Sequence, residues 1–194
     1  SPLINRNIPN VHDSRMSSGA PAKVVEMPDF NFLMNKKTLA VLNFGSQLNF
    51  KHIVFTTSSS YINIKVLHEA LLQLPTSNMV AGRLVERNGA VFPSGSFRVF
   101  SPDVLVSVLE NLGGYKYWLP EDLAIGKVLS KLNVDYFNIE SLDLSSAESI
   151  ENLTQDLVAH TSHYRLKSEF QGKRNDVALM RKLHLKIING KNNE

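Results

Sequence analysis

Short apolar runs alternate with amphipathic segments along most of the chain. Four runs rich in apolar and β-branched side chains predict strands, at residues 24–27, 52–56, 79–85 and 134–139. Segments with apolar stripes, caps or prolines predict helices, at residues 32–44, 63–74, 102–113, 120–132 and 175–188. Because strands and helices alternate, we expect a single α/β domain over residues 1–194, with a mostly parallel central sheet flanked by helices.

Glycine, asparagine and serine mark the expected connections. Arg87-Asn88-Gly89 is typical of a type I′ turn and predicts a β-hairpin. Ser94-Gly95-Ser96 predicts a loop of small residues. Ser145 followed by Glu148 matches a capping box for a short helix. Residues 1–23 are rich in residues that favour turns, which predicts a loop-like amino end.

Composition limits the classes of function. The formal net charge of +3 and the absence of any run of five like charges argue against a nucleic-acid partner. No apolar stretch reaches the roughly 18 residues that a membrane span needs. The chain has no cysteine, which excludes disulfides, thiol catalysis and thiolate metal sites. A cysteine-free chain fits a reducing compartment, so we expect a cytoplasmic location.

Adjacent carboxylates, Glu121 and Asp122, follow Pro120 at a predicted helix start. Acidic residues in a first helical turn are favoured by the helix dipole, which is the structural interpretation of the pair. The functional interpretation is a general base, which needs a positioned carboxylate next to partly desolvated surface. The apolar stripe that follows places one of the two near buried surface, and spacing alone does not decide between these interpretations.

Two further stretches carry candidate binding groups. Thr57-Ser58-Ser59-Ser60 follows a predicted strand, and ligands of open α/β sheets bind outside the carboxyl ends of strands; the alternative is a capping loop for the next helix. If residues 163–167 are extended, His163, Arg165 and Lys167 share one face. Such a face suits a diphosphate, and otherwise it is a solvated sheet edge.

In their order along the chain, four segments resemble the GT-A-type glycosyltransferases of the β-1,3-galactosyltransferase-like group. The resemblance covers residues 24–167. The segments are residues 27–39 (MPDFNFLMNKKTL), 55–63 (FTTSSSYIN), 92–101 (FPSGSFRVFS) and 121–134 (EDLAIGKVLSKLNV). The last is the most specific match, because it resembles the family's motif of an acidic pair, a glycine and spaced leucines.

The resemblance implies an inverting transfer of a sugar from a nucleotide-diphospho-sugar donor to a glycan or glycoconjugate acceptor. Asp122 would be the catalytic base, and Glu121 would position the acceptor or tune the base. Three sets of residues would bind the substrates: Thr57, Ser58, Ser59, Ser60, His163, Arg165 and Lys167 for the donor, Ser94, Gly95 and Ser96 for the floor of the sugar pocket, and Trp118, or else Tyr115 and Tyr117, for stacking on an acceptor ring. The alternative for Trp118 is a partly buried aromatic with a structural role.

The sequence departs from the family at the metal site. The family's aspartate triplet holds a divalent cation, whereas this chain has Thr57, Ser58 and Ser59, and hydroxyls are poor ligands for hard cations. Three hypotheses remain: a metal-independent enzyme whose basic side chains neutralise the diphosphate, an enzyme that holds Mn²⁺ or Mg²⁺ weakly through Asp122 or a histidine, and a non-catalytic carbohydrate- or nucleotide-binding domain of a larger protein. We favour the first.

A second departure is at the amino end. GT-A domains open with a nucleotide-binding section of strands and helix, and residues 1–23 are short for that role. Either the domain is minimal or upstream strands lie outside this chain.

Overall fold

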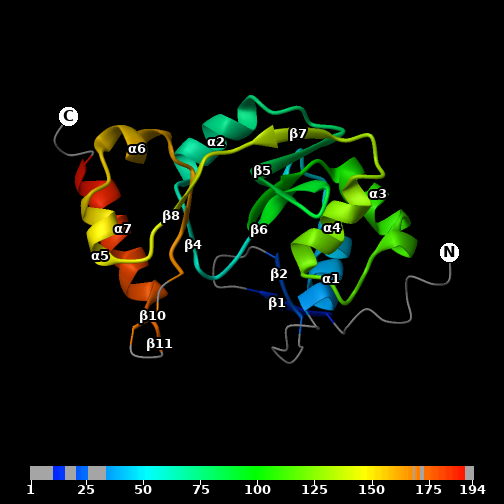
Figure 1. Cartoon of the computed structure of the whole chain (residues 1–194), viewed down its shortest axis with the longest axis horizontal. Helices are drawn as coiled ribbons and strands as arrows, with labels where there is room; N and C mark the ends of the chain where they lie inside the picture. Colours follow the sequence, from blue (N-terminus) through cyan, green and yellow to red (C-terminus); the bar gives the residue numbers. More distant parts are fainter. Residues whose placement is uncertain (1–10, 16–20, 26–33, 168, 171–172, 191–194) are drawn as a thin grey trace.

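The computed structural model describes residues 11–15, 21–25, 34–167, 169–170 and 173–190 (Figure 1). Its helices are α1 (Met34–Ser46), α2 (Ile64–Leu72), α3 (Pro102–Glu110), α4 (Glu121–Leu129), α5 (Ala147–Glu151), α6 (Gln155–His160) and α7 (Asp176–Gly190), with a 3-10 helix at Leu112–Gly114. The mixed α/β class is confirmed. The five predicted helices correspond to α1, α2, α3, α4 and α7, although residues 32–33 lie outside the described residues.

The larger sheet has four strands in the order β3-β6-β5-β7. β3 (Ile53–Thr56) and β5 (Met79–Arg87) both pair antiparallel with the central β6 (Ala90–Phe100). β7 (Asp135–Asn138) pairs parallel with β5. The predicted strands at residues 52–56, 79–85 and 134–139 are therefore confirmed as β3, β5 and β7 within a few residues.

The smaller sheet has three strands in the order β4-β9-β8. β9 (His163–Arg165) pairs antiparallel with β4 (Ser60–Ile62) and parallel with β8 (Ser141–Asp143). Both sheets are mixed, so a mostly parallel sheet is not confirmed. One physical reason is the tight turn between β5 and β6. Asn88 and Gly89 have φ of 52° and 70°, both positive as a type I′ hairpin requires. Such a hairpin joins its two strands antiparallel.

Two short strand pairs stand apart from these sheets. β1 (Val11–Arg15) pairs antiparallel with β2 (Pro21–Val25), so the expectation of a loop-like amino end does not hold for those residues. The predicted strand at residues 24–27 coincides with the end of β2, and its last two residues lie outside the described residues. β10 (Glu169–Phe170) pairs antiparallel with β11 (Lys173–Arg174).

Alternation along the central strands divides the core between the two faces of the larger sheet. Val80 and Phe100 pack with α1, α3 and α4 on one face, while Phe97 and Val99 pack with α2 on the other. A separate apolar cluster joins the smaller sheet to α5, α6 and α7, and includes the buried Tyr164. Figure 1 shows α5, α6 and α7 on the left and the larger sheet with α1, α3 and α4 on the right. Within the described residues, no helix combines the length and the apolar character that crossing a bilayer requires.

Two local expectations were wrong. Residues 94–96 are not a loop but lie within β6. Their partners on β5 are missing, because the register shifts between Gly82, opposite Arg98, and Leu84, opposite Pro93. The residues therefore continue the strand without ladder partners on that side. The capping box is displaced by one residue, since Ser146 caps α5 and exchanges hydrogen bonds with Ser149.

Gly126 allows α4 to lie directly on β6. A Cβ atom at Gly126 would sit 2.5 Å from Cδ1 of the buried Phe92, closer than packed carbon atoms approach. We expect Gly126→Ala to lower the free energy of unfolding by about 1–3 kcal/mol because helix and strand must separate. Gly113→Ala is the matched control, since a Cβ there meets no atom within 4 Å. Equal urea midpoints for the two variants would show that the contact is easily relieved.

Candidate functional site

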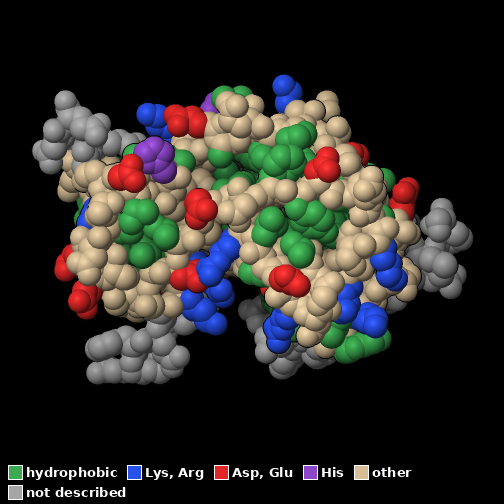
Figure 2. All heavy atoms as spheres, turned by 45° about the horizontal axis from the view of Figure 1, so that its top comes forward, with side chains coloured by type: hydrophobic (Ala, Val, Ile, Leu, Met, Phe, Trp, Pro, Cys, Tyr) green, Lys and Arg blue, Asp and Glu red, His purple; other side chains and the backbone are tan. Residues whose placement is uncertain are grey.

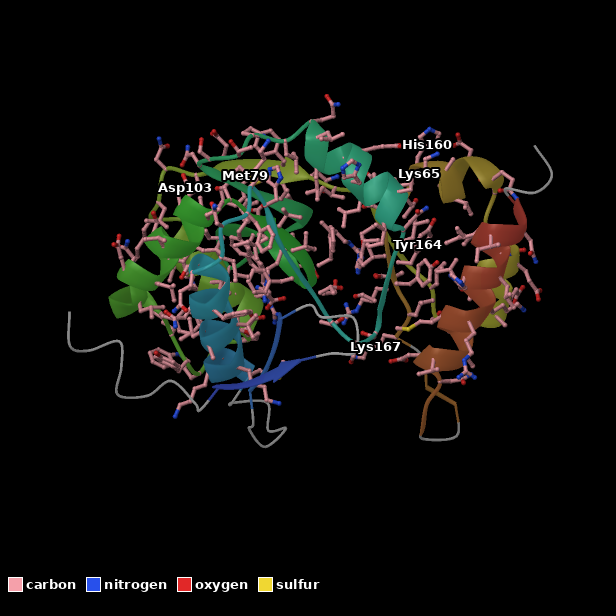
Figure 3. The ribbon with its side chains drawn as sticks, turned by 180° about the vertical axis from the view of Figure 1, so that it is seen from behind. Lys65, Met79, Asp103, His160, Tyr164 and Lys167 are labelled. Carbon is pink, nitrogen blue, oxygen red and sulfur yellow. The ribbon has the colours of Figure 1, made fainter. Side chains whose placement is uncertain are left out.

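A cleft of about 870 Å³ lies where β3 leaves the larger sheet towards the smaller one. Figure 3 places Lys167, one of its lining residues, between the part built on the larger sheet and the part that holds α7. Most of the predicted site residues share this cleft. The lining residues are Met34, Asn35, Thr57, Ser58, Ser59, Ser94, Gly95, Ser96, Tyr117, Trp118, Leu119, Pro120, Glu121, Asp122, Arg165 and Lys167.

The two predicted carboxylates occupy the first turn of α4 and have different partners. Glu121 Oε1 accepts a hydrogen bond from Arg98 Nη2, and the two side chains, 13% and 5% exposed, form a nearly buried ion pair. Asp122 Oδ2 lies 3.4 Å from the backbone nitrogen of Gly95, and Oδ1 accepts from the nitrogen of Leu123 at 2.9 Å. Asp122 has no ion pair within the described residues. The negative charge of Glu121 is thus balanced by Arg98, whereas that of Asp122 is available to a ligand in the cleft.

Gly95 brings β6 against the start of α4. A Cβ atom there would meet Glu121 Oε2 at 3.3 Å and Asp122 Cβ at 3.4 Å. Gly95 lines the cleft together with Ser94 and Ser96, and its role in the floor of a sugar pocket stays a prediction. The structure adds that the missing side chain also lets Glu121 and Asp122 lie close to β6.

Two cations reach the cleft from the end of β9, Arg165 as its last residue and Lys167 just after it. Arg165 and Lys167 line the cleft, and in the described part of the chain neither has an ion-pair partner. The Nε atom of Arg165 is buried and has no hydrogen-bond partner among those residues. Figure 2 shows Lys and Arg side chains gathered where the two halves of the molecule meet. Two unpaired cations in a cleft are suited to an anionic ligand.

The hydroxyl loop forms a connected chain of hydrogen bonds. Thr57 Oγ1 lies 3.1 Å from both Ser59 Oγ and Ser60 Oγ. Ser60 Oγ donates its single proton to the carbonyl of Ser96 at 3.1 Å, and therefore accepts from His163 Nε2 at 2.9 Å. The unprotonated Nδ1 of His163 then accepts from Ser141 Oγ at 2.5 Å. These bonds assign the Nε2–H tautomer to His163.

His163 has a different position from the one predicted. Its side chain is fully buried, stacks on Phe97 at 4.7 Å between ring centroids, and does not line the cleft. Both ring nitrogens are engaged by serine hydroxyls. Burial, with smaller contributions from Arg165 and Arg83 against the opposing effect of Asp143, lowers the pKa of His163 to about 4. Neutral at pH 7, it holds Ser60 in place and adds no charge to the cleft.

The lowered pKa of His163 predicts a loss of stability in acid. In the unfolded chain a histidine has a pKa near 6.5, so between pH 6.5 and 4 the unfolded state binds more protons. Stability is therefore complete above about pH 6.5 and falls by on the order of 3 kcal/mol towards pH 4. We expect His163→Gln to flatten this slope in urea unfolding at stepped pH. His160→Gln, at an exposed ring, is the control, and equal slopes for all three proteins would contradict the prediction.

Two buried residues that support the cleft, Asn35 and Arg98, were missed in the sequence. Asn35, at the start of α1, is 2% exposed and donates from Nδ2 to the carbonyls of Tyr117 and Leu119. Arg98 is 4% exposed beneath the carboxylates. A lone arginine inside the apolar run Phe97–Phe100 was the available signal for Arg98. Nothing in the local pattern marked Asn35, whose partners are about 80 residues away.

The cleft does not fit the divalent cation that the resemblance implies. The hydroxyl of Thr57 bonds to those of Ser59 and Ser60, and Glu121 is paired with Arg98. Arg165 and Lys167 would repel a cation in the same cleft. Among the described residues, no group of three His, Cys, Asp or Glu side chains is arranged to hold a metal ion.

Comparison with protein-family models finds no matching family, and comparison with curated proteins finds no significant relative.

Proposed function

We propose that the protein is a glycosyltransferase that moves a sugar from a nucleotide-diphospho-sugar to a hydroxyl of a carbohydrate acceptor. The observation that carries the proposal is one cleft lined by a carboxylate, Asp122, and by two cations, Arg165 and Lys167, none of which has an ion-pair partner among the described residues. Sugar transfer needs both charges, because a proton must leave the acceptor while negative charge develops on the departing diphosphate. The GT-A arrangement of the chain is part of this proposal and is supported by the order of the four resembling segments.

In the proposed reaction Asp122 takes the proton of the acceptor hydroxyl. The acceptor oxygen forms a bond to the anomeric carbon from the face opposite the diphosphate, and the carbon–oxygen bond to the diphosphate breaks. The electron pair leaves with the nucleoside diphosphate, whose charge Arg165 and Lys167 offset. Attack from the opposite face inverts the anomeric configuration.

The two carboxylates are assigned different roles because their surroundings differ. Glu121 is committed to Arg98 in a nearly buried ion pair, so its charge is already balanced. Asp122 is held by backbone nitrogens and has no cation beside it in the described residues. Asp122 is therefore the base, and Glu121 fixes the first turn of α4 and offers its second oxygen, near Gly95, to a sugar hydroxyl.

The hydroxyl loop completes the donor side of the proposal. Thr57 and Ser58 are exposed and line the cleft, where hydroxyl groups offer hydrogen bonds to phosphate oxygens or to the ribose. Ser60 lies behind them, bonded to His163 and to the carbonyl of Ser96. Ser60 and His163 are thus assigned to support of the loop, and direct donor contacts are assigned to Thr57, Ser58, Arg165 and Lys167.

One observation favours a second candidate function. Thr57, Ser58 and Ser59 stand where the resembling family has its metal-binding aspartates, as expected of a binding domain that has lost turnover. Calorimetry with a panel of UDP- and GDP-sugars and short oligosaccharides separates the two functions. Donor binding followed by transfer or hydrolysis supports the enzyme, whereas oligosaccharide binding without any affinity for a donor supports the binding domain and rejects the transferase.

A further inference from the structure

Two aromatic side chains form an exposed rim on the cleft. Tyr117 is 45% exposed and Trp118 is 78% exposed, and both line the same cleft as Asp122. The Nζ atom of Lys116 lies over the Trp118 ring, 5.9 Å from its centroid. Exposed aromatic rings leave apolar surface in water, and a ligand that stacks on them removes that surface from water. We call Tyr117 and Trp118 the aromatic rim.

The segment that carries the rim is fixed from below by buried polar contacts. Asn35 Nδ2 donates to the carbonyl of Tyr117 at 2.8 Å and to that of Leu119 at 3.1 Å. The hydroxyl of Tyr115, 5% exposed, donates to Asn35 Oδ1 at 2.6 Å. Asn35 thus uses both donors and its acceptor on this one segment, so the backbone on each side of Trp118 is held.

The Tyr115 side chain adds a second constraint. Its ring makes an edge contact with Tyr117, with 5.0 Å between centroids. Burial, with the negative charge of Glu121 as a smaller cause, raises the pKa of the Tyr115 hydroxyl, which therefore stays protonated and keeps donating to Asn35. The rim is exposed at its tip and rigid at its base, as expected of a pre-organised binding surface.

We propose that the aromatic rim binds a sugar ring of the acceptor, and that Asn35 and Tyr115 are positioning residues that hold the rim beside Asp122. The inference rests on the proposed function and names the acceptor as a glycan whose ring stacks its C–H face on Trp118. The rim belongs to the segment that leads directly into α4, so a ring stacked there lies in the same cleft as Asp122. The cations assigned to the donor come from a different segment, with Arg165 at the end of β9 and Lys167 just after it.

The tryptophan content of the chain supplies a direct probe. Trp118 is the only tryptophan, so intrinsic tryptophan fluorescence reports on the rim alone. We expect lactose, cellobiose or N,N′-diacetylchitobiose to shift its emission and to protect it from acrylamide quenching. Uridine monophosphate is the comparison, because a nucleobase also stacks on an indole ring. A shift with uridine monophosphate and none with the sugars would assign the rim to the donor base and overturn the inference.

Variants of the positioning residues test the second half of the inference. Asn35→Asp keeps the acceptor for Tyr115 and removes both donors, and Tyr115→Phe is a milder change that keeps the ring. Each is expected to raise the Kd of the disaccharide that binds by about tenfold and to increase acrylamide quenching of Trp118, with the Kd of UDP unchanged. Asn111→Asp, at an exposed asparagine outside the cleft, is the matched control.

The outcomes separate this inference from the proposed function. Sugar binding at Trp118 that weakens in Asn35→Asp supports the inference even if no donor is ever turned over. The opposite result is sugar transfer that depends on Asp122 but has an unchanged acceptor KM in Trp118→Ala and Asn35→Asp. That result would support the proposed function and overturn the inference about the rim. Equal weakening of UDP and disaccharide binding in Tyr115→Phe would also overturn it, because that result indicates general damage to the cleft.

Discussion

Asp122→Asn is expected to lower kcat for sugar transfer by about 10²–10⁴-fold, the usual contribution of a positioned general base. The amide is the same size as the carboxylate, and its oxygen still accepts from the backbone nitrogens of Gly95 or Leu123. Donor affinity and the free energy of unfolding are therefore expected to change little. Only the capacity to take a proton from the acceptor is lost.

Two comparison variants make the Asp122 result specific. Asp135→Asn, at an exposed position of β7 outside the cleft, is expected to leave kcat unchanged. Glu121→Gln breaks the charge pair with Arg98 and is expected to lower stability as well as activity, so calorimetric unfolding distinguishes it from Asp122→Asn. Near-normal turnover in Asp122→Asn would remove this residue from the mechanism.

Arg98→Met is expected to cost about 3–5 kcal/mol of unfolding free energy, the range for breaking a buried ion pair from one side. Glu121, 13% exposed, would be left ionised without its counter-charge beneath the cleft. Because domains are stable by only about 5–15 kcal/mol, such a loss is visible as a large fall in the urea midpoint.

A double variant and a surface ion pair serve as comparisons for Arg98→Met. They distinguish the cost of an unbalanced buried charge from the cost of changed packing. Arg98→Met with Glu121→Leu removes both charges and is expected to recover much of the lost stability, since apolar replacement of a buried pair is often neutral. Arg83→Met breaks the exposed pair with Asp143, whose side chains are 45% and 53% accessible, and is expected to cost about 0–1 kcal/mol. Equal losses for Arg98→Met and Arg83→Met would show that the buried pair adds no more than a surface pair.

Local sequence signals predicted the elements better than their assembly. Asn88-Gly89 and the proline at the start of α3 determine the backbone of only a few neighbouring residues. The hairpin and the helix start could therefore be predicted from the local sequence. Sheet order depends on contacts between distant segments, such as β5 with β7 and β4 with β9, which no local pattern encodes. The strand through Ser94–Ser96 was missed because a run of small residues usually indicates a loop, and no local signal shows that β6 continues through it.

The site was predictable where the chemistry lay in short motifs. Asp122, Thr57, Arg165 and Lys167 were singled out separately, and the structure brings all four to one cleft. Their roles in transfer stay predictions. His163 could not be placed, because alternation gives the face of a strand but not whether that face is covered, and here Phe97 and two serines enclose the ring.

The proposed reaction is sugar transfer with Arg165 and Lys167 in place of a metal ion. The most direct test is the release of nucleoside diphosphate from the panel of UDP- and GDP-sugars, with a disaccharide acceptor and excess EDTA. We expect acceptor-dependent release from at least one donor, unchanged by EDTA and strongly reduced in Arg165→Met with Lys167→Met. No release from any donor, or release that EDTA abolishes and manganese restores, would contradict it.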